Sequence, residues 1–140
     1  MNKLTLLTEF LKDYQHRPFE TGVNDCALFV ADWFRVLTGN DLAKSFRGKY
    51  STDLGSARLI RKLGYQNLTD FIETTADNNA HRLQEPALAQ RGDIVWFKSR
   101  NIHLCGIVVS GGVAAISQHG LVVLPITGIV AAWRVTGSKY

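Results

Sequence analysis

Cys26 has the residue type and the position of a catalytic nucleophile. It follows Asn24-Asp25, two residue types that commonly cap helices, and opens a stretch whose apolar residues Val30, Trp33 and Leu37 recur at helical spacing. Free N–H groups at a helix N-terminus favour a thiolate over a thiol, so we expect a low pKa for Cys26. The alternative is a small buried residue in the first turn of a helix, as many free cysteines are.

The elements that must position this thiol divide the chain into a helical half and a strand half. Apolar residues at helical spacing predict helices over about 2–14, 26–39 and 51–64, and a short fourth helix over 69–74. A polar connection spans 76–85. β-Branched runs separated by turn residues then predict strands over 93–97, 104–109, 113–117, 121–124 and 129–135. This order predicts an α+β fold in one domain over 1–140, with three to four N-terminal helices packed on a C-terminal antiparallel sheet of about five strands.

Composition narrows the class of function. The chain has 140 residues, of which 46% are hydrophobic and 20% charged, as expected of a globular domain. Its net charge of +4 is scattered and no basic run is interleaved with aromatic residues, which argues against nucleic-acid binding. No apolar run approaches the ~18 residues that would span a bilayer, so we expect no membrane insertion.

Cofactors and metal ions are not expected either. The four histidines are dispersed and the two cysteines lie far apart in sequence, without the close-spaced ligand pairs of zinc sites. The N-terminus lacks the pattern of a secretory signal, so we expect synthesis in the cytoplasm with Cys26 and Cys105 as free thiols.

Several short motifs, in this order, resemble those of a known family. Asp25-Cys26 is followed by an apolar helix, Arg91-Gly92-Asp93 opens a strand, and Gly106-Ile107 lies in the next strand. This pattern is similar to that of the NlpC-type cell-wall cysteine peptidases, which are papain-like. The segments 18–19, 24–29, 46–50, 120–121 and 132–135 further resemble the small proteins of this type encoded among the tail genes of tailed phages.

The resemblance implies a function and a place of action. It implies a papain-like fold and a peptide bond of peptidoglycan as the substrate. It also implies phage tail-tip or hub proteins as partners, and a location in the virion tail after synthesis in the host cytoplasm.

The resemblance also implies where the general base lies, at the start of the strand that holds Gly106. The residue type there is His103, but the family motif has its histidine two residues before the glycine, where this chain has Leu104. Because side chains alternate along a strand, His103 is expected to share a face with Cys105, and Leu104 and Gly106 are expected to face Cys26. A bulge over 102–104 would turn His103 inward.

A polar residue that orients the base is expected on the following strand. The family position falls on Ile116, and the adjacent polar candidates are Ser117 and Gln118. His119 precedes Gly120 and is predicted to lie in a hairpin turn, where it is the alternative base.

Two hypotheses follow. In the first, the chain is a cysteine amidohydrolase with Cys26 as nucleophile, His103 as base and Ser117 or Gln118 as orienting residue. In the second, it is a catalytically weakened papain-like module that serves as a plug or docking subunit of a phage tail tip, with its cleft closed by Leu104 and Ile116. Fast alkylation of Cys26 at mildly acidic pH favours the first, and ordinary thiol reactivity favours the second.

Overall fold

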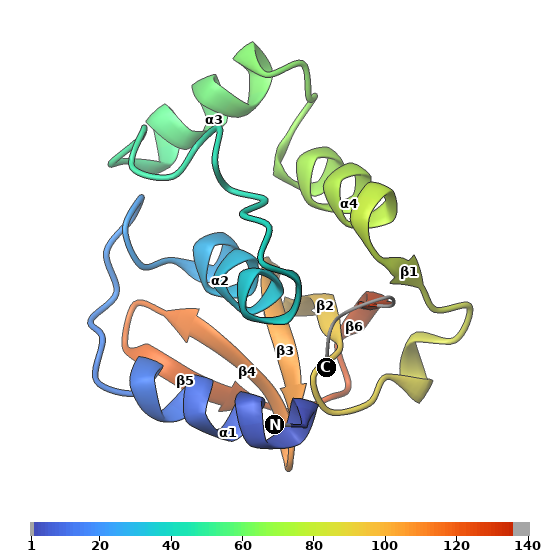
Figure 1. Cartoon of the computed structure of the whole chain (residues 1–140). Coiled ribbons are helices and arrows are strands. Elements are labelled where there is room, and N and C mark those ends of the chain that lie inside the picture. The colour runs from blue at the N-terminus through green and yellow to red at the C-terminus, as the bar shows by residue number, and fades with distance from the viewer. Residues whose placement is uncertain (1, 136–140) are drawn as a thin grey trace.

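The computed structural model describes residues 2–135 and confirms the α+β class (Figure 1). Within these residues the helices are α1 (Lys3–Tyr14), α2 (Cys26–Thr38), α3 (Asp53–Lys62), α4 (Leu68–Asn79) and a short 3-10 helix, η1 (Pro86–Leu88). The strands are β1 (His81–Arg82), β2 (Ile94–Ser99), β3 (Ile102–Val109), β4 (Gly112–Ser117), β5 (Gly120–Leu124) and β6 (Ile129–Arg134). None of these helices has the length and apolar character needed to cross a membrane.

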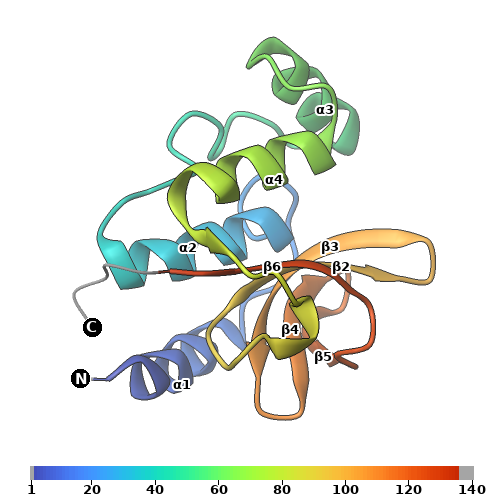
Figure 2. The same ribbon diagram turned by 90° about the vertical axis from the view of Figure 1, so that its right-hand side faces the viewer.

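The strands form one antiparallel sheet in the order β1-β6-β2-β3-β4-β5. α1 and α2 pack on one face of this sheet, and α3 and α4 lie beyond α2 on the side away from the strands (Figures 1 and 2). The two halves predicted from the sequence are therefore stacked, with α2 in the middle layer.

Capping residues set the predicted helix boundaries. The Asn2 side chain accepts a hydrogen bond from Thr5 N at 2.9 Å, and Asp25 accepts one from Leu28 N at 3.0 Å. α2 ends at Gly39, whose φ of 84° is the left-handed conformation that commonly closes a helix. Both helices therefore begin where side-chain oxygens satisfy the first free N–H groups, as the sequence predicts.

The segment 76–85 differs from its prediction as a polar connection. α4 extends to Asn79 instead of ending near residue 74, and His81 and Arg82 pair with β6 as a sixth strand. Asp77 accepts hydrogen bonds from the Trp133 indole N–H and from Arg82, both at 2.8 Å. These contacts stabilise polar residues at the edge of the sheet. The Trp133 contact joins positions too far apart in sequence for local patterns to reveal.

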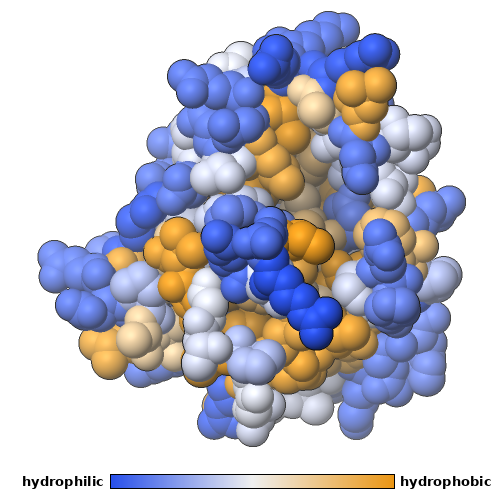
Figure 3. Space-filling model, turned by 180° about the vertical axis from the view of Figure 1, so that it is seen from behind, coloured by the Kyte–Doolittle hydropathy of each residue, from blue (hydrophilic) through white to orange (hydrophobic). Residues whose placement is uncertain are grey.

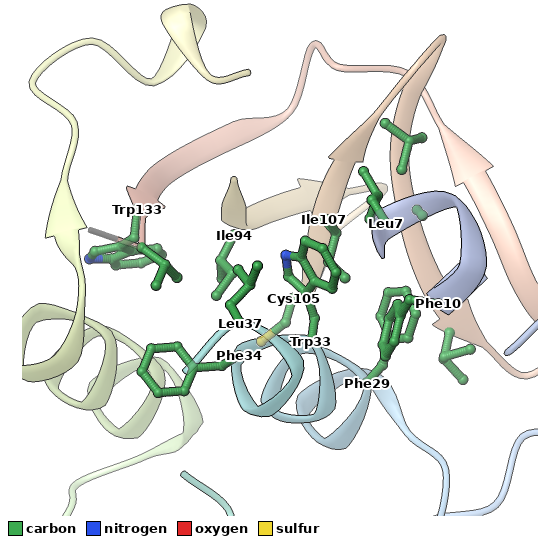
Figure 4. Packing of buried hydrophobic residues seen from close by; sticks show 14 of the residues in the cluster. Leu7, Phe10, Phe29, Trp33, Phe34, Leu37, Ile94, Cys105, Ile107 and Trp133 are labelled. Carbon is green, nitrogen blue, oxygen red and sulfur yellow. The ribbon is translucent and has the colours of Figure 1, made fainter. Parts of the chain in front are cut away.

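α2 is buried on two sides. Phe29, Trp33 and Leu37 belong to the cluster that α2 forms with α1 and the sheet (Figure 4). Leu28 and Ala31 pack the opposite way, in a cluster with residues of α3, α4 and the 43–46 segment. The Trp33 indole N–H also donates to the Gly92 carbonyl at 2.9 Å, which ties α2 to the turn before β2.

The loop that leads into α2 is closed by Gly22. Its N–H donates to the Asp25 carboxylate at 2.9 Å, and its carbonyl accepts from Gly48 N at 3.2 Å. Its φ is +85°, and a Cβ at this position would lie 1.9 Å from the Tyr50 carbonyl oxygen. A side chain is therefore excluded here by space as well as by backbone conformation.

Gly39 provides a matched control, because its φ of +84° is the same but a Cβ there would meet nothing within 4 Å. We predict that G39A lowers the free energy of unfolding by about 1 kcal/mol, the cost of a left-handed alanine. G22A is expected to lower it by about 3 kcal/mol or more, because Tyr50 must also move. Urea denaturation of both variants measures the difference, and equal losses would contradict the close contact at Gly22.

Candidate functional site

Cys26 is the first residue of α2 and is partly exposed. The preceding Asp25 is held by three donors: Leu28 N, Gly22 N and the Tyr50 hydroxyl. Because this carboxylate is buried and fully engaged, it fixes the start of the helix and with it the direction of the Cys26 side chain.

The face of β3 that meets α2 is the opposite of the one expected. Cys105 and Ile107 belong to the cluster that contains Phe29 and Trp33, and the Cys105 sulfur points toward α2 (Figure 4). Leu104 packs with the cluster on the other face of the sheet, and a Cβ on Gly106 would meet Val113 and Phe97 there.

The expectation that Leu104 and Gly106 face Cys26 is therefore wrong. It rested on the register of the family motif, and a shift of one residue exchanges the two faces of a strand. His103, two residues before Cys105, consequently lies on the α2 side without any bulge at 102–104.

Cys105 is the direct partner of the Cys26 thiol. Hydrogen bonds from the Cys105 side chain lower the pKa of Cys26, and those from the backbone N–H groups of Cys105 and Ala27 add to this effect. Burial and the negative charge of Asp25 oppose the shift, but the pKa remains below its ordinary value. The same contact, together with burial, raises the pKa of Cys105. Of the two thiols, Cys26 is therefore the one that loses its proton first, and Cys105 is the one that keeps it.

His103 is exposed, and one face of its imidazole packs on an aromatic ring. Its imidazole stacks on the buried Trp96 indole, with ring centroids 5.5 Å apart and planes inclined by 14°. Trp96 lies on β2 and is paired with Cys105, while Lys98 is paired with His103, so the stack is a diagonal contact between neighbouring strands. Trp96 is buried, as its residue type suggests, but its contact with His103 is evident only once the β2–β3 register is known.

A cavity of about 700 Å³ brings the predicted site residues together. Leu104 and Ile116 belong to its walls but do not fill it. The predicted residues that line it are Cys26, His103, Ser117, Gln118 and His119. All five candidates, drawn from one helix, one strand and one hairpin, therefore border the same space.

Ser117, Gln118 and His119 lie at the β4–β5 hairpin. The Ser117 hydroxyl donates to the Gly120 carbonyl at 3.3 Å and accepts from His119 N at 3.1 Å, so it stabilises the turn. Gln118 and His119 are exposed at its tip, which confirms the predicted turn. Within residues 2–135 no hydrogen bond joins Ser117 or Gln118 to His103, and the stacked Trp96 holds the imidazole instead.

Among the described residues, no three histidine, cysteine or acidic side chains gather as a metal ion requires. The cavity itself is lined by one thiol, that of Cys26, and by two imidazoles, those of His103 and His119.

A comparison with protein families gives a match. A family model described as Domain of unknown function (DUF6950) matches residues 3–135, a range that includes every residue lining the cavity. No curated protein matches the sequence.

The pH dependence of Cys26 alkylation tests the thiol pair. We predict that iodoacetamide reacts with Cys26 with a midpoint below that of an ordinary thiol, and that C105A raises this midpoint because the donor is lost. C105S is the matched control, since its hydroxyl still donates and should keep the midpoint low. Peptide mass spectrometry follows Cys26 alone, and an unchanged midpoint in C105A would disprove the role of Cys105.

Proposed function

We propose that this chain, which belongs to the DUF6950 family of unknown function, is a papain-like cysteine peptidase or amidase. The observation that carries the proposal is the thiol of Cys26 at the N-terminus of α2, in a cavity that His103 also lines. A nucleophile activated at a helix end and an imidazole on the facing strand are the two groups that thiol-dependent amide hydrolysis requires.

The reaction follows from these groups. The Cys26 thiolate attacks the carbonyl carbon of an amide, and the Cys26 backbone N–H at the start of α2 is available to the oxyanion. His103 in its protonated form donates a proton to the leaving nitrogen and, once neutral, takes one from the water that releases the acyl group.

His103 is a better candidate for the base than His119. Two residues on one face of a strand lie about 7 Å apart, so His103 is one such step from Cys105, the partner of Cys26. His119 lies in a turn, with no ring contact among the described residues to hold it in place.

The cavity suits a short peptide. Its volume is within the range of about 300–1,000 Å³ common for ligand sites. The walls combine Phe46 and Val122 with the charged groups of Asp53 and Arg100, so they offer both apolar contact and partners for charged ends. We propose a peptide of bacterial peptidoglycan as substrate, on the basis of the motifs around Cys26 and Gly106.

The proposed place of action is the tail of a bacteriophage, bound to tail-tip or hub proteins. This part rests on the tail-gene resemblance of segments such as 46–50 and 132–135. β5 supports it, because it is an edge strand of the sheet and its Val123 is 56% exposed. Other apolar patches also reach the surface (Figure 3).

A catalytically weakened tail subunit is the second candidate. Two observations favour it: the partner of the Cys26 thiol is Cys105 rather than an imidazole, and Ser117 is engaged in its own turn. In this case the cavity would be a docking site in the tail tip.

Hydrolysis of purified peptidoglycan fragments distinguishes the candidates. We expect release of peptide by the wild type, complete loss in C26A, and a loss of about 10²–10⁴-fold in H103A because proton transfer is removed. H81A is the matched control, since His81 is exposed on β1, at the far edge of the sheet from β5, and should keep full activity. An inactive wild type, or an H103A variant as active as H81A, would contradict the proposed mechanism.

Phage particles that carry C26A test the place of action. The peptidase predicts tails of normal appearance with reduced infectivity, because only the chemistry is removed. The docking subunit predicts normal infectivity in C26A, measured as plaque formation per particle. Particles with malformed tails would contradict both, since the thiol would then be needed for assembly.

A further inference from the structure

Cys105 is a buried nucleophile that the proposed hydrolysis does not use. It is 1% exposed and lies on β3, with its sulfur directed at α2 (Figure 4). Cys105 belongs to the core cluster between α2 and the sheet, and Cys26 packs against that cluster. The Cys26 thiol has Cys105 as its hydrogen-bond partner. The two cysteines of the chain, one from each half of the fold, are therefore in side-chain contact.

We propose that Cys26 and Cys105 form a dithiol site that low-molecular-weight disulfides oxidise to an internal disulfide bond, which removes the Cys26 nucleophile. This inference goes beyond the proposed function and holds whether or not the chain cleaves peptidoglycan.

The two thiols have unequal access to solvent. Cys26 lines the cavity of about 700 Å³, where a small disulfide can reach it. Cys105 instead lines a separate apolar pocket of about 60 Å³ with Ala27, Val30 and Ile94. A partly exposed thiol beside a buried one is the arrangement of an attacking cysteine and a resolving cysteine.

The protonation of the pair agrees with this order. The pKa of Cys26 is lowered by Cys105, and the pKa of Cys105 is raised by the same contact and by burial. Because thiolates attack disulfides and thiols do not, Cys26 reacts first and Cys105 second.

The reaction balances with the disulfide RSSR as the oxidant. The Cys26 thiolate attacks one sulfur of RSSR, a bond forms between Cys26 and that sulfur, and RS⁻ leaves. Cys105 then gives its proton to RS⁻, its thiolate attacks the Cys26 sulfur, and the second RS⁻ leaves and takes a proton from water. The two cysteines lose two electrons, and RSSR is reduced to two RSH.

The site can accommodate the bond with small movements. A disulfide requires a sulfur–sulfur distance of about 2.05 Å, shorter than any hydrogen-bond contact, so α2 and β3 must approach or their side chains rotate. The pocket of about 60 Å³ beside Cys105 provides unfilled volume for this adjustment.

Glutathione disulfide is the probe for the experiment. We expect the reduced full-length chain to lose the mass of two hydrogen atoms, and peptide mapping to find Cys26 linked to Cys105. The oxidised protein should lose at least about tenfold in iodoacetamide reactivity at Cys26, and dithiothreitol should restore it. C105S should stop at a glutathione adduct on Cys26, because the resolving thiol is absent.

C26S is the matched control, in which the buried Cys105 should stay unmodified over the same time. A wild type that keeps glutathione on Cys26, or that links two chains instead, would overturn the proposal. So would a C26S variant that reacts at Cys105 as fast as the wild type reacts at Cys26.

This test is independent of hydrolysis. A chain that forms the internal disulfide but cleaves no peptide refutes the proposed function alone. A chain that cleaves peptide but stops at the glutathione adduct refutes the dithiol site alone.

Discussion

The packing of α2 between the sheet and the α3–α4 pair is the constraint on which the site depends. Apolar side chains leave α2 in two directions, and the Trp33 N–H adds a fixed point at the Gly92 carbonyl. A helix held on both sides cannot rotate or slide without opening a cavity in one of two cores, which costs several kcal/mol. The position of its first residue, Cys26, is therefore as rigid as the core itself.

Opposing effects act on the pKa of the Cys26 thiol. Asp25 caps α2, and its negative charge and the burial of the site both disfavour a thiolate next to it. The donors from Cys105 and the Ala27 N–H outweigh them, because hydrogen bonds to a charged sulfur are stronger than those to a neutral one. The Tyr50 hydroxyl donates to one oxygen of Asp25, so this buried side chain has a partner besides the N–H groups of Gly22 and Leu28.

Local patterns predicted the elements, but contacts between strands required the structure. The helix starts at Asn2 and Asp25 and the end of α2 at Gly39 follow from capping, which depends on neighbouring residues only. The face of β3 was predicted wrongly, because alternation groups His103 with Cys105 but does not say which group meets the helix. The Trp96–His103 stack and the anchoring of Asp77 by Trp133 depend on strand pairing, which a single sequence does not encode locally.

The two halves of the chain contribute one side of the cavity each. Cys26 comes from the helical half, whereas His103 comes from β3, a strand made later during synthesis. A nascent chain that has left the ribosome only as far as α4 therefore holds the start of α2 without the facing strand. The contacts of the Cys26 sulfur with Cys105 can form only after β3 has been made and packed on α2.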